Sequence, residues 1–375
     1  MKKMFLFAAM AGVAFASCTN DVTSVDNSAL ESKAIAWDTH VMSTRANLAT
    51  DVNFASMAFS GTTPYFSDIA TGKGAKVGYG LNTSYATNWV TENLYYWPLD
   101  GGNLGFVSVA PYDDNSVASY DYTLNSDAIE FEYVVPVIAS VDETQDTTLD
   151  ILYASKAECS ENQVPVAFTH ALAKLNVVIG ATKVNLRSEE TNKEWDIKVS
   201  DVVINDIDNT GSVNLTWNGS AWTVANSVWT EATSSSVNQL DLVTADKDIT
   251  YSGTLSHQLL TELWIMPQAV KGKTLEITYS ITTKSYNDVT ATDRVETAAA
   301  ITKTYKKVID LNSVAIAGTD GTDYYWQMNK NITYTVDINP SEDATPILWA
   351  QPTVADFVSD GATINIDKNN FGTEQ

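Results

Sequence analysis

Short runs rich in Val, Ile, Tyr and Phe follow one another along most of the 375-residue chain, with clusters of Gly, Asn, Asp and Ser between them. Runs of this kind, bounded by turn residues, predict β-strands. The clearest run alternates Ile332, Tyr334, Val336 and Ile338 with polar residues. Helical periodicity is almost absent and strands do not alternate with helices, so the pattern predicts an all-β chain made of β-sandwiches.

Two features interrupt the strand pattern. Apolar residues stand on even positions from Val164 to Phe168 and on odd positions from Leu175 to Ile179, which predicts a bulge or a corner near His170. Further on, the polar stretch 187–193 separates two groups of strands and predicts the connection between two domains. We therefore expect one β-sandwich over residues 46–190 and a second over residues 191–375.

The first residues have the pattern of an export signal. Lys2 and Lys3 precede an apolar run from Met4 to Phe15, which is shorter than the about 20 residues of a permanent membrane span. Small residues then stand directly before Cys18, as in the bacterial lipobox, whose cysteine is acylated and becomes the new N-terminus. We expect a signal peptide at 1–17 and a lipid on Cys18. The alternative is an ordinary signal peptide with an incidental cysteine.

Residues 18–45 are polar and predict a lipidated tether, with a short strand near its end. In that strand Ile35, Trp37 and Val41 fall on one face, which is the alternation of a half-buried strand. The pair Arg45-Ala46 follows, and Arg45 is one of only three arginines in the chain. An arginine is therefore placed between the tether strand and the body.

Charge and cysteine content exclude several kinds of partner and of stabilisation. The chain has 22 basic and 46 acidic residues, a formal net charge of −24. A field of this sign repels nucleic acid and anionic membrane surfaces, so neither is expected as a partner. Only two cysteines are present, and a lipid on Cys18 would leave none to pair with the other. The stability must then come from the hydrophobic core.

Few residues are arranged as catalytic or metal sites require. The sequence has no HxxxH, CxxC or GxSxG spacing, and His170 lies within a strand pattern, where a structural role is expected. Residues 206–211 begin like a calcium loop, but Trp217 stands where an EF-hand needs a bidentate Glu. A turn between strands is the better interpretation of this segment. We expect no metal, no cofactor and no enzymatic activity.

The ten tryptophans and seventeen tyrosines admit two interpretations. They could form platforms on which sugars stack, or they could be strand residues that pack the core. Trp89, Tyr95, Tyr96 and Trp97 fall within strand patterns, which favours packing. A carbohydrate-binding surface lipoprotein stays the alternative function.

Several segments, taken in order, resemble the fimbrillin family, the type V pilins of Bacteroidales. They are Tyr95 to Pro98, Leu104 to Pro111, Leu149 to Ala154 and Val164 to Leu175. Each is a strand-core pattern, so the order is the specific part. Cys18 and Arg45-Ala46 also stand where the family has its lipidation and its maturation cleavage. The resemblance runs from Cys18 to the tail and is strongest between residues 89 and 180.

The resemblance implies a shaft or tip subunit of an adhesive pilus, with two tandem transthyretin-like or Greek-key β-sandwich domains. The precursor would reach the outer membrane as a lipoprotein held by the lipid on Cys18, and an Arg-specific protease would cut it after Arg45. Loss of the strand around Ile35, Trp37 and Val41 would open a groove for the C-terminal strand of another pilus subunit, which gives a head-to-tail polymer on the cell surface. Whether Arg187 is also cut stays open. The residues expected on the donor strand are Ile347, Trp349, Val354, Phe357, Ile364 and Ile366.

Overall fold

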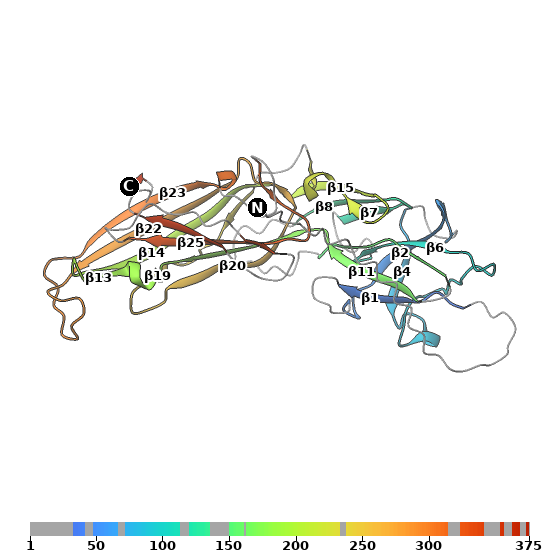
Figure 1. Ribbon diagram of the computed structural model, residues 1–375, viewed down its shortest axis with the longest axis horizontal. Helices are drawn as coiled ribbons and strands as arrows, with labels where there is room; N and C mark the ends of the chain where they lie inside the picture. Colours follow the sequence, from blue (N-terminus) through green and yellow to red (C-terminus); the bar gives the residue numbers. More distant parts are fainter. Residues whose placement is uncertain are drawn as a thin grey trace, which may run out of the picture.

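The computed structural model describes residues 33–41, 48–66, 72–112, 120–135, 150–160, 163–232, 238–313 and 323–340, and the backbone of short strands at 353–355, 362–367 and 373–374. This part of the chain consists of strands, loops and short 3₁₀ turns without an α-helix, so the all-β prediction is confirmed. Two lobes follow each other along the long axis (Figure 1). Within the described residues, no helix has the length and apolar character needed to cross a membrane.

The first lobe is built on a nine-stranded sheet in the order β10-β6-β9-β11-β1-β5-β4-β2-β3. A further pairing between β2 and β6 closes this sheet, so that every strand except β3 and β10 belongs to a ring. The sequence does not predict this closure. The strands are β1 (Trp37–Val41), β2 (Phe54–Ser60), β3 (Thr63–Pro64), β4 (Ala75–Tyr79), β5 (Trp89–Thr91), β6 (Leu104–Ala110), β9 (Leu152–Ala154), β10 (Ala157–Cys159) and β11 (Val164–His170).

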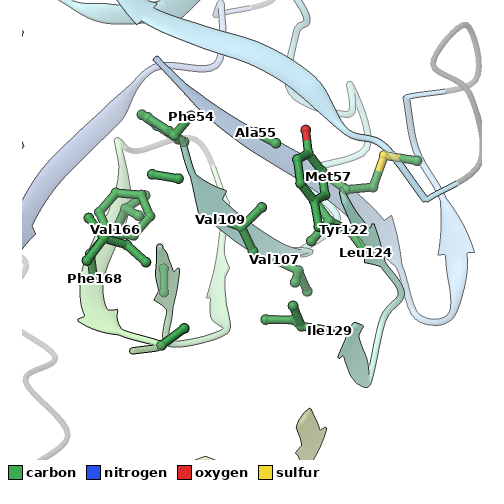
Figure 2. Packing of buried hydrophobic residues seen from close by; sticks show 14 of the residues in the cluster. Phe54, Ala55, Met57, Val107, Val109, Tyr122, Leu124, Ile129, Val166 and Phe168 are labelled. Carbon is green, nitrogen blue, oxygen red and sulfur yellow. The ribbon is translucent and has the colours of Figure 1, made fainter. Parts of the chain in front are cut away.

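A smaller sheet packs against the ring and shares its hydrophobic core. Its order is β16-β15-β8-β7, and β17 also pairs with β15. Met57 and Val107 of the ring gather with Leu124 and Ile129 of the smaller sheet in Figure 2. The strands are β7 (Tyr120–Leu124), β8 (Ala128–Val134), β15 (Thr210–Trp217), β16 (Trp222–Thr223) and β17 (Thr230–Glu231).

The second lobe has two sheets that bury one core between them, as in a sandwich. One sheet has the order β13-β14-β22-β23-β28 with β18 and β19 beside β14, and the other has β20-β12-β25-β26 with β27 beside β25. Strands β21 and β24 form a separate pair. The first sheet contains β13 (Arg187–Ser188), β14 (Lys193–Ile207), β18 (Asn238–Asp241), β19 (Lys247–Ile249), β22 (Thr274–Ser285), β23 (Ile301–Asp310) and β28 (Thr373–Glu374). The others are β12 (Ala173–Gly180), β20 (Ser256–Ile265), β21 (Gln268–Ala269), β24 (Tyr325–Trp326), β25 (Asn331–Asn339), β26 (Thr353–Ala355) and β27 (Ala362–Asp367). The 3₁₀ turns are η1 (Thr83–Tyr85), η3 (Lys183–Leu186), η4 (Ala225–Ser227) and η5 (Leu311–Ser313).

The chain passes from the first core to the second directly after β11. Leu172 belongs to the first core and Ala173 to the second, so the corner predicted near His170 is confirmed. The polar stretch 187–193 instead forms the β13–β14 hairpin, and residues before and after it, Leu186 and Trp195, are both buried in the second core. A boundary between residues 190 and 191 therefore does not divide the cores, because it falls inside one sheet.

After β14 the chain returns to the first lobe through the segment in which the sequence predicts a turn. Asp206 has a φ of 65°, and Asp208 and Asn209 separate β14 from β15. Gln268 donates to the backbone oxygen of Asp208 at 2.9 Å, and Lys273 Nζ lies 2.8 Å from its carboxylate. The segment connects two strands as predicted, but β14 and β15 lie in different sheets, so it carries the chain between the two lobes and is not a tight turn.

Candidate functional site

Strand β1 occupies a gap in the ring between β11 and β5. It runs parallel to β11 over five residue pairs, from Trp37↔Val164 to Val41↔Phe168. On its other side it meets β5 at the single pair Trp37↔Trp89, and the backbone N–H of Ile35 donates to Tyr95 at 2.8 Å. Of the pairings that close the ring, the one between β1 and β5 is the shortest.

The side chains of β1 confirm the predicted alternation. Ile35 and Trp37 are 0 % and 1 % exposed, Val41 is half-buried against the same core, and Asp38 points to solvent. They lie in phase with the buried residues of β11, so one face of β1 completes the lining of the ring. Burial of an Ile or Trp side chain stabilises by about 1.5–3 kcal/mol. The strand around Ile35, Trp37 and Val41 is therefore an integral part of the core.

Trp37 fills a pocket with aromatic walls and a polar floor. Its ring meets the rings of Phe54 and Phe106 edge-on, at centroid distances of 6.4 and 6.2 Å. Its indole N–H donates to the hydroxyl oxygen of Ser56 at 3.1 Å, and the Ser108 hydroxyl donates to the same oxygen at 2.9 Å. Both serines are buried and directly opposite each other on β2 and β6. The pocket thus fits a large ring that carries one hydrogen-bond donor.

Sequence reasoning missed the two serines, although a signal was present. Each is a lone hydroxyl residue in the middle of an otherwise apolar strand, Phe54 to Phe59 and Phe106 to Ala110. A buried hydroxyl needs a partner, so a pair of such residues indicates a polar contact inside the core.

Thr39 is the weak point of β1. It is 1 % exposed, and its hydroxyl has no hydrogen-bond partner in the described part of the protein. An unsatisfied buried hydroxyl costs about 1–3 kcal/mol. The strand is consequently held less tightly than its apolar contacts alone would hold it.

The tail residues predicted on the donor strand are described only in part. Val354 lies on β26, which pairs antiparallel with β25, and Ile364 and Ile366 lie on β27, which pairs parallel with β25. These pairings belong to the chain's own second lobe. The other predicted site residues lie outside the described residues: Cys18, Arg45, Ala46, Ile347, Trp349 and Phe357.

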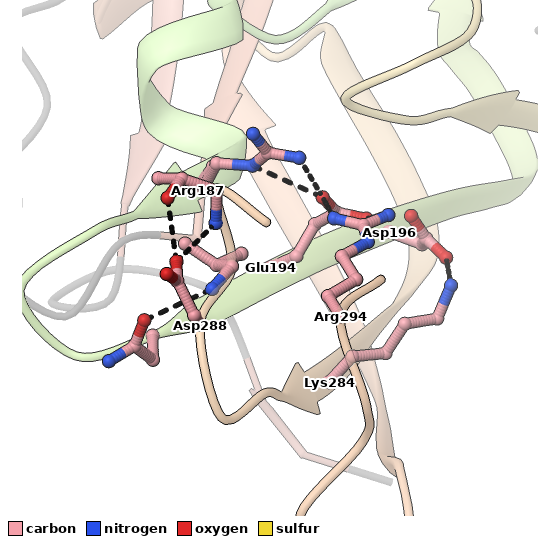
Figure 3. A network of polar contacts seen from close by, with 9 residues as sticks. Arg187, Glu194, Asp196, Lys284, Asp288 and Arg294 are labelled. Atoms are coloured by element: carbon pink, nitrogen blue, oxygen red, sulfur yellow. Dashed lines mark hydrogen bonds and ion pairs between the residues drawn. The ribbon is translucent and has the colours of Figure 1, made fainter. Parts of the chain in front are cut away.

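The two arginines of the second lobe share one carboxylate. Arg187 Nη2 lies 3.0 Å from Glu194 Oε2, and Arg294 Nη1 lies 2.6 Å from the same oxygen (Figure 3). Arg187 also lies over the ring of Tyr251, and Arg294 over that of Tyr286. The Glu194 side chain is only 4 % exposed. Both arginines are thus fixed, which argues against a second cleavage at Arg187.

Burial raises the pKa of Glu194, but the hydrogen bonds from Arg294 and Arg187 outweigh it, so its pKa lies below the usual 4.5. A lowered folded-state pKa stabilises the fold above the unfolded value, and this contribution is lost as the pH falls through the folded value. The cluster therefore stabilises the second lobe at neutral pH and loses that effect in acid.

Glu194→Gln should lower the free energy of unfolding at pH 7 by about 2 kcal/mol or more, because both guanidinium groups lose their counter-charge. Its acid sensitivity below pH 4.5 should be smaller than that of the wild type. Denaturant melts at several pH values measure both effects. Asp323→Asn, which removes an exposed partner of Lys271, is the matched control and should change stability little. Equal effects of the two substitutions would contradict a structural role for the cluster.

Other predicted features are structural. His170 is buried, and its Nδ1 lies 2.7 Å from Asp150 Oδ1. The tryptophans in the described ranges are buried except for Trp217 and Trp264, which are half-buried, so the prediction that they pack the core is confirmed. The same prediction is wrong for Tyr96, which is 43 % exposed. Within the same ranges, no three His, Cys, Asp or Glu side chains gather as a metal site would require.

Comparison with known protein families identifies the family of this chain. A model of the family described as fimbrillin-like matches residues 44–356. The chain belongs to the fimbrillin-like family. Fimbrillin-like proteins are structural and adhesion proteins of the cell surface, so the chain is not an enzyme.

Several solved structures similar to this fimbrillin-like chain come from Bacteroides species. A fimbrial protein of Bacteroides vulgatus has 13 % identity and a TM-score of 0.46, with 88 % of this chain and 98 % of that chain covered. A provisionally assigned cell adhesion protein of Bacteroides uniformis has 16 % identity and a TM-score of 0.44, with 87 % of this chain and 99 % of that chain covered. No curated protein matches the chain.

Proposed function

We propose that the chain is a shaft or tip subunit of a cell-surface pilus, and that a strand of a neighbouring subunit replaces β1. The observation that supports this is the place of β1: it completes the closed sheet of the first lobe, yet one cut after Arg45 would separate it covalently from every other described strand.

Departure of β1 would leave an acceptor groove, defined here as the gap between β11 and β5 with the Trp37 pocket beneath it. Unpaired backbone groups would line both edges of the groove, and apolar side chains its floor. A strand from another chain satisfies both, because it supplies backbone hydrogen bonds and alternate side chains at once.

The tail is the proposed donor, through its apolar residues between Ile347 and Ile366. A contact between the tail of one subunit and the first lobe of the next joins two different surfaces. Such contacts do not close on themselves and produce filaments.

The remaining steps of the proposal follow from sequence and family. The precursor travels as a lipoprotein acylated on Cys18, is held at the outer membrane by this lipid, and is cut between Arg45 and Ala46 by an Arg-specific protease. We also propose that both lobes are variants of a transthyretin-like or Greek-key sandwich, since each has two sheets around one core.

Treatment of the purified precursor with an Arg-specific protease tests this function. The cleaved protein should form a detergent-resistant ladder on gels, while the uncleaved protein should stay monomeric. A cleaved protein that stays monomeric, and whose melting temperature rises by several degrees with one glycan of a panel, would instead support a carbohydrate-binding protein.

A further inference from the structure

The sequence Ile-x-Trp occurs at both ends of the chain. Trp37 stands on β1 and Ile35 two residues before it, and Ile347 and Trp349 stand in the tail. Of the ten tryptophans, only Trp37 and Trp349 have an isoleucine two positions before them. Trp349 is also the only tryptophan after Trp326.

The Trp37 pocket selects for this pattern. The ring must meet the edges of Phe54 and Phe106, and a donor must reach the buried oxygen of Ser56. An aliphatic side chain would leave space beside both rings and would not donate to Ser56. Two positions earlier along the strand, the fully buried site of Ile35 requires an aliphatic residue.

We propose that Ile347–Gln351 of one subunit takes the place of Ile35–Thr39 in the next, with Trp349 in the Trp37 pocket. This inference rests on the proposed function and names the segment that is donated. The match ends at Gln351, because Pro352 would fall on the position of His40 and proline has no backbone N–H to donate.

The other tail strands fit the pocket less well. Ile364 and Ile366 have the spacing of alternate residues but offer no indole. Their strand β27 already pairs with β25 over six residues, from Tyr334↔Ala362 to Asn339↔Asp367. The assignment therefore separates an anchor segment, Ile347–Gln351, from a strand that belongs to the subunit's own second lobe.

The exchange replaces Thr39 by Gln351 at a buried position. The buried amide would need hydrogen-bond partners, as the Thr39 hydroxyl does, so this position does not favour the exchange. An incoming strand with the same isoleucine and tryptophan recovers the two largest apolar contacts.

Trp349→Ala in the full chain tests the assignment, with Ile364→Ala/Ile366→Ala as the matched control. After cleavage, Trp349→Ala should reduce the detergent-resistant ladder by about a hundredfold or more, as expected for truncation of a buried tryptophan. Trp349→Phe should be intermediate, since it keeps a ring but loses the donor to Ser56. The control pair should still form ladders.

Mixing the Trp349→Ala variant with wild-type subunits tests whether the variant is folded. A cleaved Trp349→Ala subunit keeps its own groove, so it should accept the tail of a wild-type subunit and cap filaments at one end. A normal ladder from Trp349→Ala, together with loss of the ladder in the control pair, would overturn this assignment and leave the proposed function standing. A normal ladder after deletion of residues 347–375 would overturn both.

Discussion

Residues 33–190, expressed as a separate fragment, should fail to fold. The first core needs strands that come later in the sequence: β15 pairs with β8 over seven residues, from Thr210↔Val134 to Thr216↔Ala128. The fragment would lack Val213, Leu215, Trp222 and Trp229 of that core.

The two tryptophans make the loss severe. The Trp222 indole donates to the backbone oxygen of Ala154 at 2.8 Å, and the Trp229 indole donates to that of Ala171 at 2.9 Å. Trp229 also stacks on Phe131, with ring centroids 6.2 Å apart. Removal of a buried tryptophan typically costs about 3–5 kcal/mol. Two such losses together are comparable to the total free energy of unfolding of a domain, which is about 5–15 kcal/mol.

Circular dichroism melts and proteolysis of the fragment measure whether it folds. We expect no cooperative transition for residues 33–190 alone, and recovery of a folded complex when residues 191–375 are co-expressed, because β15 can then pair with β8. A cooperative melt of the isolated fragment would show that the first lobe folds without β15, contrary to the shared core.

Arg45→Ala should give a folded, lipidated protein that does not polymerise. The strand Ile35–Val41 would stay covalently attached and would compete for the acceptor groove at a high effective concentration, which a separate chain cannot match. Ile35 and Trp37 are both completely buried, so little of the groove is open while β1 is present.

The matched variant lacks residues 347–375 and should fail for the opposite reason, since its groove opens but no donor exists. In mixtures with wild-type subunits, the tail-deleted subunit should cap one filament end and the Arg45→Ala subunit the other end. Electron microscopy of filament length and gold labelling of the ends distinguish the two. Normal filaments from Arg45→Ala alone would exclude an exchange that is triggered at this arginine.

The sequence predicts most strands because their period of two survives in the core. Residues 331–339 alternate as expected in β25, whereas residues 104–110 form β6 as an apolar run that is buried on both faces. The alternation of Ile35, Trp37 and Val41 likewise predicts a half-buried strand, and the structure shows it inside the ring.

The division between the lobes was harder to predict. The phase slip between Phe168 and Leu175 marks the true change of core, while the polar stretch 187–193 is only the exposed end of a hairpin. Both features look like interruptions along the chain. Strands β8 and β15 are separated by more than 70 residues in the sequence, and only their pairing shows which strands share a core.

The polar floor of the Trp37 pocket could not be derived from the two-residue period of the strands alone. Ser56 and Ser108 meet because β2 and β6 pair in one register, and a shift by one residue would turn both away from Trp37. The same is true of Glu194, which meets Arg294 only through the return of the chain 100 residues later.

A cryo-electron microscopy map of filaments assembled from the cleaved protein tests the central claim most directly, through the density between β5 and β11. The account predicts a strand of the neighbouring subunit there, with a tryptophan ring between Phe54 and Phe106 and within hydrogen-bond distance of Ser56. Residues 35–41 of the same chain in that position, inside an assembled filament, would contradict it.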